Sequence, residues 1–143
     1  SESIQILSDV VGLFSHITLK LARERTEELL REAAVPNRLI TEYLKLLKSC
    51  FYPNVYQFNQ LVYRLPADIG IPIGSPLGPL ISEVCMEKFE SELFQSNHPL
   101  LSHISLWRRY VDDVYCVWHG PNESITQFLS FMNNLYPSIE FTV

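Results

Sequence analysis

Two adjacent aspartates, Asp112 and Asp113, are the strongest candidates for chemistry in this 143-residue sequence. The flanking segments 107–111 and 114–118 are rich in residues that favour β-strands, which predicts a hairpin whose turn is centred on the two aspartates. Adjacent carboxylates repel each other unless a cation neutralises them, and oxygen ligands of this kind suit Mg²⁺. Turns also favour aspartate for local hydrogen bonds, so the pair alone leaves a purely structural interpretation open.

Asp9 strengthens the case for a metal site. It is the only charged residue between Glu2 and Lys20, and it interrupts an apolar segment, 3–13, that predicts a buried strand. A buried carboxylate is costly without a cation or several hydrogen-bond donors. Beside the predicted hairpin, Asp9 would complete a set of three carboxylates able to hold two Mg²⁺ ions, as in the two-metal sites of polymerases. A local capping or bridging role for Asp9 is the alternative.

A loop dense in glycine and proline, 68–79, is the third element of interest. Glycine lets the main chain approach a ligand closely, and the N-terminus of a following helix offers free N–H groups to phosphate. We expect that helix to begin near Pro76, with Ser75 as its cap. A simple connector remains the alternative interpretation of the loop.

The remaining sequence predicts the elements that must position these residues, in an α+β fold of one domain, 1–143, with helices over one face of a sheet. The further elements expected are helices over 18–34, 37–51 and 124–135, a hairpin over 55–58 and 61–63, two strands within 104–118 and a strand from 139 to 143.

Composition narrows the functional classes. No apolar run reaches the roughly 20 residues of a membrane-spanning helix, so no membrane partner is expected. The three cysteines, Cys50, Cys85 and Cys116, have no zinc-binding spacing and predict reduced core thiols in an intracellular protein. The net charge of −5 is unusual for a protein that binds nucleic acid alone, because such proteins present a basic surface.

Together the three elements resemble motifs A, B and C of reverse transcriptases, in the same order. The similarity is greatest to the Penelope-like retroelement reverse transcriptases, which are related to telomerase. Segment 8–14 resembles motif A, segment 70–81 resembles motif B, and segment 109–113, with its Tyr-Val-Asp-Asp sequence, resembles motif C. Segment 128–142 resembles the part of the family that follows motif C, so the resemblance covers nearly the whole chain.

The resemblance implies a polymerase palm, an antiparallel sheet with helices on one face, plus part of the fingers. It implies an RNA-directed DNA polymerase that adds deoxynucleotides to a primer with two Mg²⁺ ions, Mn²⁺ being a possible substitute. The residue roles implied are metal binding by Asp9, Asp112 and Asp113 and by Val10, nucleotide binding by Val11, Gly12, Leu13 and Phe14, and template and primer binding by Gly74, Ser75, Pro76 and Tyr110.

The implied partners are an RNA template, a DNA primer and deoxynucleotides, in the nucleus. Upstream fingers, thumb and endonuclease would belong to a larger chain and would carry most of the basic clamps. Phe14 matches the aromatic ring that crowds a ribose 2′-hydroxyl, which predicts a preference for deoxynucleotides, although an ordinary core phenylalanine is the alternative.

Two other functions stay open. The first is a non-catalytic remnant retained as a binding or scaffold module, because segment 65–69 lacks the glutamine usual before motif B and instead contains Asp68. The second is another palm enzyme, an RNA-dependent RNA polymerase or a nucleotidyl cyclase, against which Phe14 and Val111 argue.

Overall fold

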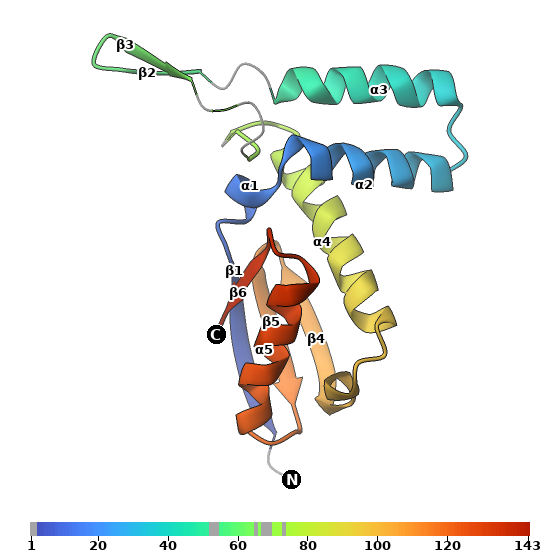
Figure 1. The fold of residues 1–143 in the computed structure, drawn as a ribbon, viewed down its shortest axis with the longest axis vertical. Coiled ribbons are helices and arrows are strands. Elements are labelled where there is room, and N and C mark those ends of the chain that lie inside the picture. Colours follow the sequence, from blue (N-terminus) through green and yellow to red (C-terminus); the bar gives the residue numbers. More distant parts are fainter. Residues whose placement is uncertain (1–2, 52–54, 65, 67–69, 73) are drawn as a thin grey trace. The chain divides into compact units, whose positions relative to one another are not determined.

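The computed structural model describes residues 3–51, 55–64, 66, 70–72 and 74–143. The chain divides into two compact units, unit 1 (residues 1–13 and 86–143) and unit 2 (residues 14–85). The elements follow one another along the chain as drawn in Figure 1. Their bounds are β1 Ile4–Val11, α1 Leu13–His16, α2 Leu19–Glu32, α3 Asn37–Cys50, β2 Val55–Phe58, β3 Leu61–Arg64, α4 Gly78–Gln95, the 3₁₀ helix η1 Pro99–His103, β4 Ile104–Tyr110, β5 Asp113–Trp118, α5 Glu123–Leu135 and β6 Glu140–Thr142.

Unit 1 contains a four-stranded sheet in the order β4-β5-β1-β6, and neighbouring strands are antiparallel. The two central strands alternate between buried and more exposed residues, because successive side chains of a strand point to opposite faces. The buried residues of one face are Ile6, Ser8 and Val10 from β1 and Val114, Cys116 and Trp118 from β5. The sheet therefore has one covered face and one open face.

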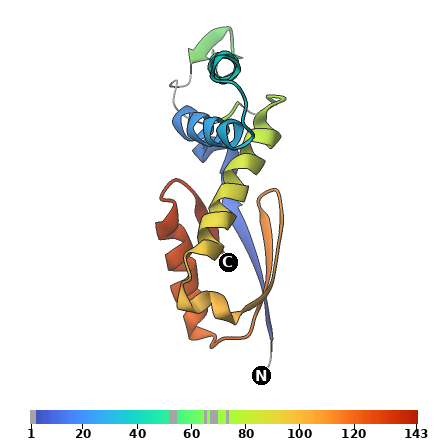
Figure 2. The ribbon, with the colours of Figure 1, turned by 90° about the vertical axis from the view of Figure 1, so that its right-hand side faces the viewer.

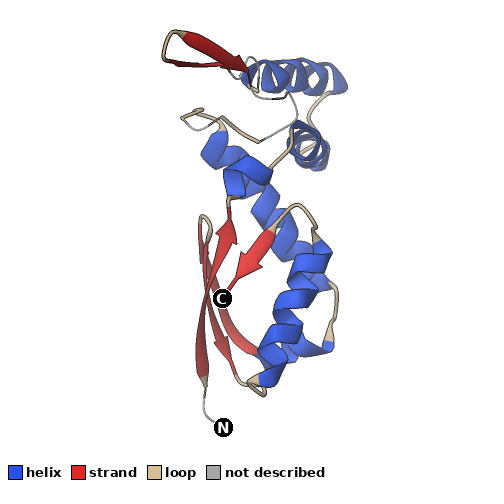
Figure 3. Ribbon diagram, turned by 60° about the vertical axis from the view of Figure 1, so that its left-hand side comes forward, coloured by secondary structure: helices blue, strands red, loops and turns tan. Residues whose placement is uncertain are grey.

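Helices α5 and the Met86–Gln95 part of α4 cover the same face of this sheet (Figures 2 and 3). The ring of Phe89 on α4 lies 4.9 Å from that of Phe141 on β6, and Trp118 lies 5.3 Å from Phe128 on α5. Asn133 accepts a hydrogen bond from the Phe141 N–H at 2.7 Å and donates one to its carbonyl at 3.1 Å. The predicted α+β fold, with an antiparallel sheet and helices on one face, is confirmed at this level.

Unit 2 contains the antiparallel helices α2 and α3 and the separate two-stranded hairpin of β2 and β3 (Figure 1). The side chain of Thr18 caps α2 by accepting a hydrogen bond from the Leu21 N–H. A row of buried residues at helical spacing packs α3, namely Ile40, Leu44, Leu47 and the following Phe51. Each predicted helix and the predicted hairpin of this region is present.

Three sequence predictions need correction. Helix α4 begins at Gly78 rather than near Pro76, because Pro76 and Leu77 form a turn in which the Gly78 N–H donates to the Ser75 carbonyl. The first strand is buried on one face only, so Asp9 is exposed and Leu7 is 73% exposed. Cys50 is also exposed, because it shares the outer side of α3 with Tyr43 and Leu46.

In the part of the chain that the structure describes, no helix combines the length and the apolar character needed to cross a membrane.

The cysteines give a direct test of these burial assignments. Burial raises the pKa of the Cys85 and Cys116 thiols to about 11, so both stay protonated at pH 9, and a thiol reacts as its thiolate. We expect one thiol, that of Cys50, to react rapidly with iodoacetamide at pH 9. Mass spectrometry should find no rapid labelling in Cys50→Ser, and rapid labelling of a second cysteine in that variant would contradict the burial described.

Candidate metal centre

The register of the two central strands places Asp9 and Asp113 directly opposite each other. The Val10 N–H donates to the Asp112 carbonyl at 3.0 Å, one residue beyond that pair. In an antiparallel ladder this bond flanks a pair that exchanges no hydrogen bonds of its own, and the Cα atoms of such a pair lie about 4.5 Å apart. The side chains of Asp9 and Asp113 therefore lie close together on the open face of the sheet.

Asp112 joins this pair from the turn between β4 and β5. One carboxylate oxygen from each of Asp9, Asp112 and Asp113 lies within 4.8 Å of the other two. Asp112 is half-buried and the other two are exposed. The sequence placed these three residues together although about a hundred residues separate Asp9 from the others, and the structure agrees.

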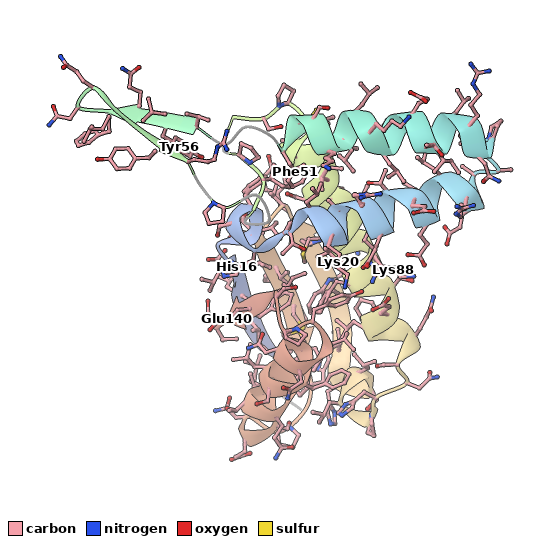
Figure 4. The ribbon with its side chains drawn as sticks, turned by 45° about the horizontal axis from the view of Figure 1, so that its top comes forward. His16, Lys20, Phe51, Tyr56, Lys88 and Glu140 are labelled. Carbon is pink, nitrogen blue, oxygen red and sulfur yellow. The ribbon has the colours of Figure 1, made fainter. Side chains whose placement is uncertain are left out.

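The three carboxylates fit a divalent cation by their donor chemistry. Oxygen ligands suit Mg²⁺, which binds through one or two carboxylates and keeps several waters. Asp9 was predicted to be buried and is in contact with solvent, so its carboxylate does not need a cation to offset a cost of burial. What favours a cation is the mutual repulsion of three like charges, which a bound cation would relieve. Glu140 on β6 adds a fourth carboxylate to the open face, opposite Val11 (Figure 4).

The turn that carries Asp112 is strained. Val111 has a φ of +58°, which is unusual for a β-branched residue and is adopted by glycine at the first position of many two-residue hairpin turns. Such a residue costs about 1–3 kcal/mol and persists only where its surroundings hold it. Both turn carbonyls are held here, that of Val111 by the Arg109 guanidinium at 3.0 Å and that of Asp112 by the Val10 N–H.

Arg109 connects this turn to helix α4. Its side chain is 6% exposed, and its Nε and Nη2 donate to the two carboxylate oxygens of Glu90 at 2.9 and 3.2 Å. The Trp107 indole N–H donates to the same Glu90 carboxylate at 2.9 Å. A bidentate pair of this kind fixes the direction of the guanidinium and hence of the bond to Val111. No sequence pattern predicted the contact of Arg109 with Glu90, because local patterns do not link residues nineteen positions apart on different elements.

The other residues expected around the centre in unit 1 are placed as follows. The Val10 side chain is buried on the covered face, so only its main chain is near the carboxylates. Val11 ends β1, Gly12 turns the chain with a φ of +56°, and the Leu13 side chain is buried. Tyr110 ends β4 opposite Asp113 and is 80% exposed, so its ring stands on the open face.

Three of the expected residues of unit 2, Phe14, Gly74 and Ser75, line a small cavity of about 180 Å³. Its lining is Phe14, Pro72, Gly74, Ser75, Gly78 and Pro79. The Phe14 carbonyl accepts a hydrogen bond from the Ile71 N–H at 2.7 Å, which fixes the loop against α1. Pro76 is exposed and does not line the cavity. Ile73, Asp68 and most of segment 65–69 lie outside the described residues.

Charge is distributed unequally between the units. Unit 1 contains three Lys and Arg residues against nine Asp and Glu, a net of −6, whereas unit 2 contains eight against seven, a net of +1. The negative net charge of the chain therefore belongs to the unit that carries the three aspartates. A polyanion would meet less repulsion from unit 2 than from the chain as a whole.

No protein-family model matches the chain. No curated protein matches it either.

Replacement of Arg109 by lysine tests the connection between the turn and α4. Lysine keeps the charge but has no planar fork, so it cannot hold both Glu90 and the Val111 carbonyl. We expect Arg109→Lys to lower the free energy of unfolding by about 2 kcal/mol. Arg108→Lys is the matched control, because Arg108 is an exposed neighbour, and it should change stability by less than about 0.5 kcal/mol. Equal losses measured by urea unfolding would contradict the assignment.

Two glycines of the loop give a second comparison. Both have a positive φ, +65° at Gly70 and +90° at Gly74. A Cβ at Gly70 would lie 2.8 Å from the Ser15 Cα, whereas one at Gly74 would meet nothing within 4 Å. Gly70→Ala should therefore cost about 1–3 kcal/mol more than Gly74→Ala, because both share the backbone strain and only the first clashes with main chain. Thermal unfolding of the two variants measures the difference.

Proposed function

We propose that this chain is the catalytic core of an RNA-directed DNA polymerase that uses two Mg²⁺ ions to add deoxynucleotides to a primer 3′-hydroxyl. The observation that supports the proposal is the proximity of the Asp9, Asp112 and Asp113 carboxylates at the open face of an antiparallel sheet. In this assignment unit 1 is the palm of a retroelement reverse transcriptase similar to the Penelope-like family, and unit 2 is part of its fingers.

The open face of the sheet offers groups that could hold the metal ions and contact the primer. Asp9, Asp112 and Asp113 would hold the ions, which when bound supply Lewis-acid activation of a hydroxyl and neutralise charge on phosphate. The covered face is filled by the core, so substrates have access to the carboxylates from the open face. The Tyr110 ring stands on that face opposite Asp113, where it can contact the end of a primer.

In this proposal the nucleotide and template contacts come from glycines with a left-handed backbone and from residues beside them. Gly12 has a left-handed φ and directly follows β1, which suits main-chain contact with a triphosphate. Phe14 and Ser75 line one cavity with Gly74, at which even an added Cβ would meet no atom within 4 Å. The RNA template, the DNA primer and a nuclear location are part of this proposal.

Metal binding is the first test. At a magnesium concentration tenfold above the dissociation constant, binding stabilises the folded state by about 1.4 kcal/mol. In a chain of this size the expected rise in melting temperature is about 4 °C. Sodium chloride of equal ionic strength is the control for screening, and Asp113→Asn should abolish the difference between the two salts. The exposed Glu123→Asn on α5 should leave it intact.

Primer extension on an RNA template is the decisive test of activity. We expect extension with deoxynucleotides to fall at least a thousandfold in Asp112→Asn/Asp113→Asn, because both substitutions remove metal ligands. The assay should be run on this chain and on a longer chain that contains it, with ribonucleotides in parallel. Equal extension by the variant would refute the proposal. Magnesium binding without extension in either chain would favour a non-catalytic binding module, and a preference for ribonucleotides would favour another palm enzyme.

A further inference from the structure

The hairpin of β2 and β3 has two faces of different chemistry. Its register pairs Tyr56 with Tyr63 and Phe58 with Leu61. Residues directly opposite each other in an antiparallel pair share a face, and alternate residues along each strand do so too. One face therefore consists of three aromatic rings and a leucine, here called the aromatic face: Tyr56, Phe58, Leu61 and Tyr63. The other face carries Val55, Gln57, Val62 and Arg64.

The aromatic face is uncovered. Its four side chains are between 46% and 72% exposed, and among the described residues each strand pairs only with the other. Figure 4 shows the ring of Tyr56 projecting from the hairpin. Two-stranded hairpins are only marginally stable in water, and apolar side chains on them are normally packed against something. Such a concentration of exposed rings indicates a surface that binds a partner.

The charge around the hairpin favours an anionic partner. Between Glu42 and Asp68 the sequence contains no acidic residue, and its three charges are Lys45, Lys48 and Arg64. Lys45 forms an ion pair with Glu42 at 3.3 Å. The positive charges nearest to the hairpin in sequence are then Lys48, on the preceding helix, and Arg64, within the hairpin itself. This stretch is the longest in unit 2 with only positive charge, in a chain whose net charge is −5.

We propose that the aromatic face is a stacking platform for unpaired bases of single-stranded nucleic acid, whose phosphates contact Lys48 and, around the edge of the two-stranded ribbon, Arg64 on its other face. Aromatic rings beside basic residues bind single strands without sequence preference, because every base has a face that can stack. The turn residues Asn59 and Gln60 and the tyrosine hydroxyls add hydrogen-bonding groups at the rim. The platform rests on the proposed function only in that the strand would be the unpaired part of the template.

A second copy of the chain fits this surface less well. Stable interfaces bury about 800 Å² on each partner, from roughly 20–30 residues, whereas the aromatic face offers four side chains. A positively charged segment also gains nothing from meeting its own copy, since like charges repel. Self-association through the hairpin is accordingly an outcome that would overturn the proposal.

The experiment measures binding of a fluorescent single-stranded RNA of twelve nucleotides by anisotropy, in EDTA. The test variant is Tyr56→Leu/Phe58→Leu/Tyr63→Leu, which keeps apolar side chains but removes every ring. We expect its dissociation constant to rise at least tenfold. The matched control, Val55→Thr/Val62→Thr, changes the other face and should shift it less than twofold. Arg64→Gln should weaken binding and reduce the dependence of affinity on salt.

Three results of the binding experiment would overturn the proposal. Equal binding by the triple leucine variant and the wild type, or an equal loss in the control, overturns the proposal. So does concentration-dependent dimerisation that the triple variant abolishes while the wild type binds no RNA. Phe58→Leu alone, with an expected loss of at least threefold, serves if the triple variant does not fold. Because EDTA removes metal, the binding assay does not depend on the metal centre, so failure of the platform and failure of the polymerase proposal remain distinguishable.

Discussion

The pairing of β1 with β5 is the interaction on which the rest of unit 1 depends. It sets Asp9 against Asp113 on one face and puts Val10 and Val114 into the core on the other. A slip of one residue in β1 would exchange these faces, burying the carboxylate and exposing the apolar side chains. The same register that stabilises the sheet therefore assembles the acidic cluster.

The covered face of this sheet stabilises unit 1, whereas the open face carries the clustered aspartates. Burial of the aromatic and aliphatic side chains beneath α4 and α5 stabilises the unit, which offsets the repulsion of the clustered aspartates and the strain at Val111. The ion pair of Arg109 with Glu90 couples the two, because it ties the strained turn to a helix on the covered side. We infer that an open, acidic and strained hairpin tip is tolerated here because the layer beneath it is closely packed.

The two units differ in net charge and therefore suit ligands of different charge. The acidic surplus of unit 1 favours cations, whereas the stretch around the β2–β3 hairpin carries only positive charge and three exposed rings. The overall net charge of −5 obscured this, since a total says nothing about which unit carries it. Single strands and divalent cations would bind to different units, and the two kinds of binding can be measured separately.

The sequence by itself determined the element types and the aspartate turn, because strand alternation and turn residues are local signals. The expected proximity of Asp9 to that turn was confirmed by the structure. The sequence predicted the β2–β3 hairpin but not its aromatic face, which depends on the register that pairs Tyr56 with Tyr63. Only the tertiary structure decided that Asp9 is exposed, since an apolar run does not reveal how many faces of a strand are covered. It alone revealed the contact of Arg109 with Glu90, because contacts between distant elements depend on packing that no local pattern encodes.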